Sequence, residues 1–168
     1  MGFSNDQYDI YISYHPAQST QAQRFSRKLF KASIKSWING NINSYNSRLF
    51  DQSLDAIQSS LIFVCILSKE YIKNTMCRVE FSTAVEQKLT IISLSTDDTK
   101  IDQSDPAFNI GKSIFFEFNL YELDLLGNND EFNSVCNLLT ELIEYQEKNK
   151  ASYKIKIKDF YKSIANQN

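Results

Sequence analysis

The sequence predicts an α/β domain built on a five-stranded parallel sheet with helices on both faces. Apolar, β-rich runs alternate along the chain with segments whose apolar residues repeat at helical spacing. The run at residues 61–68 is apolar almost throughout, which is typical of a central parallel strand covered on both sides. With 168 residues, the chain is long enough for one domain with a substantial core and short for two.

The first half of the chain predicts two strands and two helices. Residues 8–14 form an apolar strand that His15-Pro16 ends, and a helix follows from a polar cap at residues 19–21 to about residue 31. Residues 33–38 are expected as the second strand, residues 39–44 have the composition of a loop, and residues 47–59 carry a helical apolar stripe.

The second half continues the alternation. The strand at 61–68 precedes a helix at about 74–88 and a fourth strand at 90–95. Residues 96–110 are polar and predict a loop, followed by a fifth strand at 112–118. A final helix is predicted from apolar residues that repeat at helical spacing: Phe132, Val135, Cys136, Leu139, Leu142 and Ile143. Five strands with right-handed crossovers most often take the flavodoxin-like order 2-1-3-4-5.

Charge divides the chain into a domain at residues 1–147 and a basic C-terminal tail at 148–168. The whole chain carries −2, and the tail carries +5 because six lysines oppose only Asp159, which leaves −7 on the domain. An acidic body does not predict a nucleic-acid partner. Residues 153–157 alternate like a strand, whereas residues 157–164 repeat like a helix, so we expect the tail to form an extra helix.

Several site classes are excluded. The three cysteines have no close pairs, which argues against a disulfide framework and favours a reducing compartment. His15 is the only histidine, so no metal site is expected. Neither glycine-rich phosphate motif occurs. The N-terminus lacks the features of a signal peptide, and no apolar run is long enough for an integral membrane segment, so we expect a cytoplasmic protein.

Ligands of such sheets bind beyond the carboxyl ends of the strands, where the strand order reverses. Here that crevice lies between the first strand, which ends in Ser13-Tyr14-His15, and the third, which ends at Ser68. Helical spacing places Glu80 on the flank of an apolar arc, where partial desolvation would raise its pKa. The alternative interpretation is a solvated helix carboxylate that supports Lys73 or Lys88.

The ordered motifs resemble those of the TIR (Toll/interleukin receptor) domain family. Residues 8–14, Tyr-Asp-Ile-Tyr-Ile-Ser-Tyr, are similar to its first conserved strand. Residues 57–71 resemble its second region, and Cys77-Arg78-Val79-Glu80 followed by the strand at 91–94 resembles its third. The resemblance covers roughly residues 8–145.

That resemblance implies one of two functional classes, and both stay open. Some members cleave NAD⁺ at the nicotinamide–ribose bond, and the glutamate that matches Glu80 is then catalytic. NAD⁺ is the substrate and no cofactor is required. The expected substrate-binding residues are Tyr14, His15, Asn39, Ser68 and Met76.

Other members are non-catalytic scaffolds that recruit further TIR domains. In either class we expect homotypic self-association, with Asn41, Ile42 and Asn43 at the interface. Two departures bear on the choice: Met76 stands where catalytic members often carry Trp, and residues 39–43 contain no acidic residue.

Overall fold

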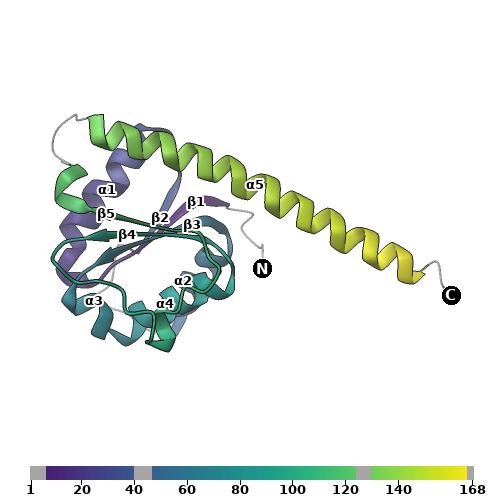
Figure 1. The fold of residues 1–168 in the computed structure, drawn as a ribbon, viewed down its shortest axis with the longest axis horizontal. Helices are drawn as coiled ribbons and strands as arrows, with labels where there is room; N and C mark the ends of the chain where they lie inside the picture. Colours follow the sequence, from purple (N-terminus) through teal and green to yellow (C-terminus); the bar gives the residue numbers. More distant parts are fainter. Residues whose placement is uncertain (1–6, 40–46, 124–129, 166–168) are drawn as a thin grey trace.

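The computed structural model describes residues 7–39, 47–123 and 130–165. Five parallel strands form one sheet in the order β2-β1-β3-β4-β5, as predicted, and the fold is a flavodoxin-like α/β fold (Figure 1). The strands are β1 (Tyr8–Ser13), β2 (Ser36–Ile38), β3 (Ser60–Leu67), β4 (Thr90–Ser95) and β5 (Phe115–Asn119).

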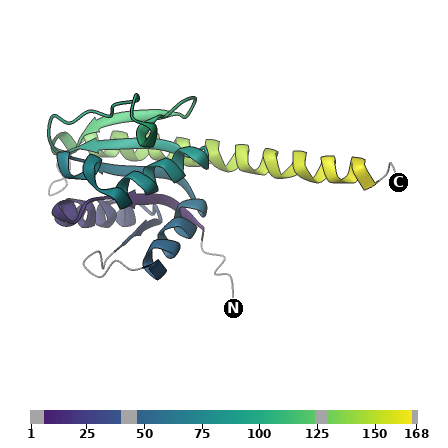
Figure 2. The same ribbon diagram turned by 90° about the horizontal axis from the view of Figure 1, so that it is seen from below.

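Helices cover both faces of the sheet (Figures 1 and 2). On one face α1 (Ser19–Lys31) and α5 (Asp130–Ala165) pack against alternate residues of the strands, including Ile12 and Val64. The other face is covered by α2 (Ser47–Gln58), α3 (Lys69–Lys73) and α4 (Thr75–Glu86). Short 3₁₀ turns complete the chain: η1 (Pro16–Gln18), η3 (Pro106–Phe108) and η4 (Leu120–Leu123).

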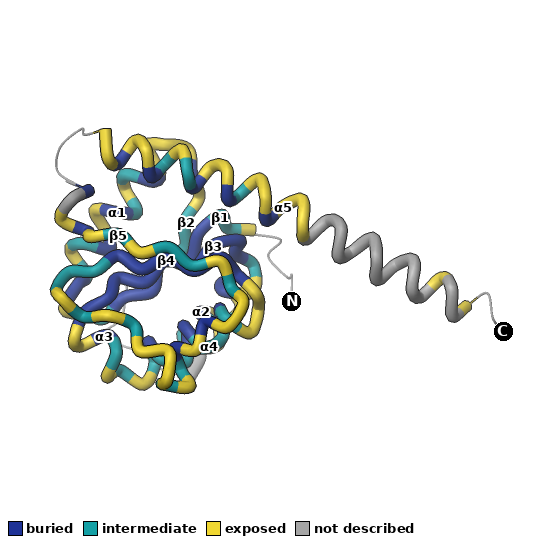
Figure 3. Tube along the Cα trace, viewed as in Figure 1, coloured by how far each residue is buried: buried dark blue, intermediate teal, exposed yellow. Residues whose placement is uncertain are grey.

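The central strand β3 is the best-buried element, as its apolar sequence predicts. All eight of its residues are buried (Figure 3). A strand between two parallel neighbours and two helix layers has no solvent face, so it needs no polar alternation.

Three aromatic rings stack across adjacent strands on the α2–α4 face. The Tyr11 ring lies 5.0 Å from the Trp37 ring of β2 and 5.6 Å from the Phe63 ring of β3, with interplanar angles of 10° and 5°. The three residues are register partners in the parallel ladder, so the pairing itself aligns the rings. This stack fixes the position of Tyr11 in the centre of the sheet.

The structure corrects three element boundaries. The second strand begins at Ser36 rather than residue 33, because Ser33 has a positive φ of 62° and forms the turn after α1. The fifth strand begins at Phe115, after a turn in which Gly111 has a φ of 59°. The helix expected at 74–88 is preceded by α3, a separate turn capped by Ser68.

The tail is helical, but it is not an extra helix. Helix α5 runs without interruption for 36 residues and contains both the predicted stripe and residues 148–165. The division into a domain at 1–147 and a tail at 148–168 stays a prediction. No helix within the described ranges is long and apolar enough to cross a membrane.

The ring stack predicts a large difference between two phenylalanine variants. Phe63→Ala removes a fully buried ring beside Tyr11 and should lower the free energy of unfolding by about 3–5 kcal/mol. Phe30→Ala, whose ring is 81% exposed on α1, should change it by less than about 0.5 kcal/mol. Urea unfolding of both variants measures this difference, and equal effects would contradict the described core.

Candidate active site

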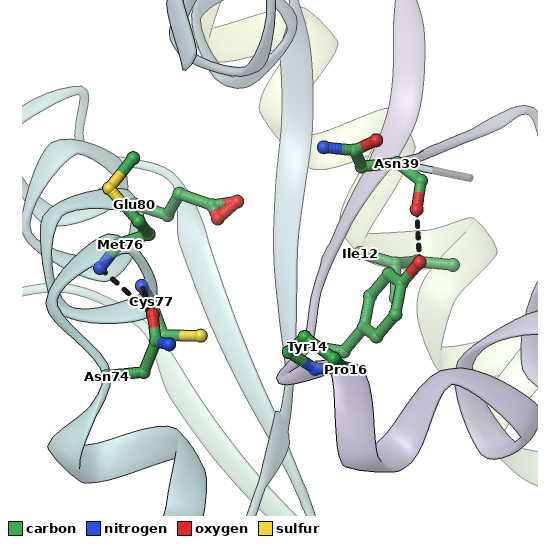
Figure 4. A pocket seen from close by; sticks show the side chains of 8 residues that line it. All are labelled: Ile12, Tyr14, Pro16, Asn39, Asn74, Met76, Cys77 and Glu80. Carbon is green, nitrogen blue, oxygen red and sulfur yellow. Dashed lines mark hydrogen bonds between the residues drawn. The ribbon is translucent and has the colours of Figure 1, made fainter. Parts of the chain in front are cut away.

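A cavity of about 150 Å³ lies at the carboxyl end of β1, where the strand order reverses. Its described lining comes from the end of β1 and the turn after it, from the residue after β2, and from the start of α4 (Figure 4). The lining residues are Ile12, Tyr14, Pro16, Asn39, Asn74, Met76, Cys77 and Glu80. This is the crevice predicted from the strand order.

The start of α4 sets the position of Glu80. Asn74 caps the helix, and its Oδ1 accepts hydrogen bonds from the backbone N–H groups of Met76 and Cys77, both at 3.0 Å. Arg78 ties the same turn to the segment between β4 and η3 by donating two hydrogen bonds to the Asp105 carboxylate, at 2.7 and 2.9 Å. These contacts hold α4 so that Glu80, less than two turns from its start, points into the cavity (Figure 4).

Hydroxyl groups of β1 hold the Glu80 carboxylate. The Tyr11 hydroxyl donates a hydrogen bond to Oε1. Two residues along the strand and on the same face, the Ser13 hydroxyl donates to Oε2 at 3.5 Å. The Ser13 Oγ also lies 2.8 Å from the Tyr71 hydroxyl of α3. Because Ser13 donates its own proton to Glu80, it accepts this hydrogen bond from Tyr71.

Glu80 is the one buried carboxylate among the described residues, with 7% of its surface exposed. Burial raises its pKa from the usual 4.5 to about 7, although the bonds from Tyr11 and Ser13 act in the opposite direction. The predicted raised pKa is therefore supported, and the burial is deeper than the expected flank position. The alternative of a solvated carboxylate is wrong.

The opposite wall of the cavity is formed by Tyr14 and Asn39. The Tyr14 hydroxyl donates to the backbone carbonyl of Asn39, which joins the end of β1 to the end of β2. Burial raises the pKa of Tyr14 to about 12, with Glu80 adding to the effect, so the phenol stays neutral. Figure 4 shows Asn39 and Tyr14 facing Glu80 and Met76 across the cavity.

Of the predicted site residues, the structure brings together Tyr14, Asn39, Met76 and Glu80. His15 and Ser68 do not line the cavity. The His15 ring accepts from the backbone N–H of Ala17 and caps η1. Ser68 caps α3 by accepting from the Tyr71 N–H, and it donates to Gln18 at 3.0 Å.

The predicted interface residues Asn41, Ile42 and Asn43 lie outside the described residues.

Tyr11 and Ser13 were not predicted from the sequence as partners of Glu80. Both belong to the first strand, and their alternation placed them on one face of it. One feature of the sequence did point to them. Two residues with hydroxyl groups occupy the same face of a strand that is otherwise apolar, and buried hydroxyl groups require hydrogen-bond partners.

The chemistry available at this cavity is that of one carboxylate. No Lys, Arg or second acidic side chain belongs to the described lining. Burial raises the pKa of the Cys77 thiol, with Glu80 adding to the effect, so it is not a thiolate nucleophile near neutral pH. Within the described ranges no three His, Cys, Asp or Glu side chains gather in a way that could hold a metal ion.

Comparison with known proteins establishes the family. A TIR domain family model matches residues 10–133, which is most of the chain, so this chain belongs to the TIR domain family. No curated protein matches it.

Two solved structures share the fold. The TIR domain of the Toll-related receptor TRR-2 from Hydra magnipapillata is 21% identical, with a TM-score of 0.51 over 65% of this chain and 84% of that one. The diflavin flavoprotein A3 from Nostoc sp. is 13% identical, with a TM-score of 0.53 over 88% of this chain and 99% of that one. At these identities the likeness concerns the fold alone.

The raised pKa predicts how Glu80 affects stability. Between pH 4.5 and about 7 the folded protein keeps a proton that the unfolded chain loses, so this group destabilises the fold as pH rises. Glu80→Gln removes that penalty. Its stability relative to the wild type should therefore increase by up to roughly 3 kcal/mol between pH 4.5 and pH 8.

Urea unfolding at several pH values measures this change, with Glu86→Gln as the control because Glu86 is exposed on the same helix. A pH-independent difference for Glu80→Gln, matching that of the control, would show that Glu80 titrates normally.

Proposed function

We propose that this TIR domain cleaves NAD⁺ at the nicotinamide–ribose bond, with Glu80 as the catalytic residue. The observation that carries the proposal is a single buried carboxylate that points into a cavity at the strand-order reversal, with no cation in the described lining. Such a site favours a reacting group that is positively charged, and both the nicotinamide ring of NAD⁺ and the ribose in the transition state meet that requirement.

In the proposed reaction the bond between ribose C1′ and the nicotinamide nitrogen breaks. Its electron pair goes to the ring, which leaves as neutral nicotinamide, while positive charge develops on C1′ and the ring oxygen. The ionised Glu80 carboxylate stabilises that charge. Water then adds to C1′ and releases a proton, giving ADP-ribose; attack by a nitrogen of the adenine ring would give a cyclic product instead.

The size of the cavity limits what it can enclose. About 150 Å³ is less than the roughly 300–1,000 Å³ of pockets that surround drug-sized ligands. The cavity therefore suits the nicotinamide end of the dinucleotide, between Met76 and Tyr14, with Asn39 on the opposite wall. In this proposal the rest of NAD⁺ lies outside the cavity, towards His15.

The proposed activity accompanies self-association in the cytoplasm. Asn41, Ile42 and Asn43 are the proposed contact residues, as the resemblance to TIR domains implies, and they lie outside the described residues. No cofactor takes part in this scheme.

The alternative is a non-catalytic TIR scaffold. Met76, which lines the cavity in place of the Trp of many catalytic relatives, favours it, because a thioether provides a smaller stacking surface for a pyridine ring. On this alternative Ile42→Asp abolishes assembly, whereas Glu80→Gln has no functional effect.

Nicotinamide release separates the two functions. Concentrated wild-type protein should release nicotinamide from NAD⁺, and the rate should rise about tenfold per pH unit below pH 7 and level off above it, because the reaction requires ionised Glu80. Glu80→Gln should lower the rate at least about a hundredfold. Chromatography of the products measures both effects.

Glu86→Gln is the matched control and should retain the wild-type rate. The absence of release from concentrated, assembled wild-type protein would contradict the enzyme proposal and favour the scaffold. Equal rates for the Glu80→Gln variant and the wild type would contradict the assignment of Glu80.

A further inference from the structure

The charges of the domain are unevenly distributed around α1. Residues 1–147 together carry −7. Within them, residues 10–50 contain no Asp or Glu and six cationic residues: Arg24, Arg27, Lys28, Lys31, Lys35 and Arg48. The other residues of 1–147 therefore carry −13. A strongly acidic domain thus has one cationic region, and most of its cations lie on α1.

Three of these cations form an exposed stripe along α1. Arg24, Arg27 and Lys31 are exposed and follow the spacing i, i+3 and i+7. At 100° per residue they fall within an arc of about 60°, on the side of the helix away from its buried residues. No side chain of this cationic stripe has a hydrogen bond or ion pair with another residue that the structure describes.

Nothing within α1 relieves the repulsion in the cationic stripe. Arg27 and Lys31 are four residues apart, a spacing at which like charges destabilise a helix, and α1 contains no Asp or Glu. The helix dipole favours a cation only in the last turn, so it stabilises Lys31 but not Arg24 or Arg27. The cationic stripe is therefore suited to an anionic partner outside the domain.

Phe30 adds an apolar group to the same face of α1. Its side chain is 81% exposed, the highest fraction among the exposed large apolar residues of the described ranges. It lies about 60° around the helix from Arg27, so Arg27 adjoins both Phe30 and Lys31. An exposed phenylalanine beside cations fits a partner that is anionic at its surface and apolar just beneath. The interface of an anionic lipid bilayer has both properties.

We propose that the cationic stripe of α1 binds the surface of an anionic phospholipid bilayer, with Phe30 inserted at the boundary between headgroups and acyl chains. The contact is peripheral, because the apolar side of α1 stays packed on the sheet and only Phe30 enters the lipid. The acidic remainder of the domain is repelled by the same surface, so the attraction at α1 also fixes the orientation of the bound domain.

This surface is separate from the candidate active site. Helices α1 and α5 cover one face of the sheet, whereas α4, which carries Glu80, lies on the other (Figures 1 and 2). Neither Phe30 nor the cationic stripe belongs to the described lining of the cavity. Membrane binding is therefore independent of NAD⁺ cleavage, and it differs from the interface proposed at residues 41–43.

Flotation of the full chain with lipid vesicles tests the proposal. The wild type should bind vesicles of phosphatidylcholine with about 30% phosphatidylserine, should not bind pure phosphatidylcholine, and should be released as salt rises from about 0.1 to 0.5 M. Arg27→Glu with Lys31→Glu should raise the dissociation constant at least about twentyfold, because each cation near such a surface contributes roughly a fivefold gain in affinity. Phe30→Ala should raise it about tenfold through the lost apolar contact.

The matched control is Lys100→Glu with Lys112→Glu. Both lysines are exposed in the segment between β4 and β5, and the control changes the net charge by the same amount as the α1 reversal. It should bind the anionic vesicles as the wild type does. Circular dichroism of each variant verifies that the fold is intact.

Four results would overturn the proposal. The first is a wild type that does not bind the anionic vesicles, and the second is binding that survives the α1 reversal, as it would if the lysines of residues 148–165 carried it. The third is binding that Phe30→Ala leaves unchanged and that inositol hexakisphosphate matches, which would assign the stripe to a soluble polyanion. The fourth is a dimer without vesicles that the α1 reversal dissociates, which would assign it to a second copy. Flotation needs no NAD⁺, so its outcome does not depend on the enzyme proposal.

Discussion

The burial of the Glu80 carboxylate against the Tyr11 hydroxyl is the interaction on which the proposed site depends. A carboxylate with 7% of its surface exposed is costly to ionise, and its pKa rises to about 7 even though two hydroxyl groups bond to it. Such a group is maintained only where the surrounding structure fixes it. Here the fixed part is Tyr11, held between the Trp37 and Phe63 rings by the register of three parallel strands. The central sheet therefore fixes the position of the Glu80 carboxylate through Tyr11.

Helix α4 brings that acid group to the cavity from the other side. Its start is held by the Asn74 cap and by the Arg78–Asp105 ion pair, whose side chains are about one third exposed, at 34% and 27%. Glu80 thus lies between two independently anchored elements, the sheet and the helix. A carboxylate near its midpoint at neutral pH, in a cavity without described cationic lining, is suited to stabilising developing positive charge. The same burial makes the fold less stable as pH rises, so the proposed function and stability oppose each other at this residue.

The sequence predicted the order of the strands, the position of the crevice and the helix that carries Glu80, because these follow from periodicity and from the handedness of the crossovers. The predicted substrate-binding residues Tyr14, Asn39 and Met76 line the cavity, and their role in binding stays a prediction. The bonds from Tyr11 and Ser13 could not be predicted, because they join residues 69 and 67 positions apart and depend on how deeply α4 packs. Periodicity likewise failed to show that α3 and α4 are separate helices, since the break depends on Asn74 alone, whose extended backbone ends α3 and whose side chain caps α4. It also failed to show that α5 continues through the basic tail, since residues 153–157 carry an alternation typical of a strand.

The most direct test of this account is a carbon-13 NMR titration of the Glu80 carboxyl, assigned by comparison with Glu80→Gln. A midpoint near pH 7, lowered when NAD⁺ or another cationic pyridinium ligand is added, is the result expected of a buried carboxylate that opposes positive charge. A midpoint near 4.5, unchanged by such ligands, would mean that the carboxylate is solvated in solution, and it would contradict both the described burial and the role proposed for it.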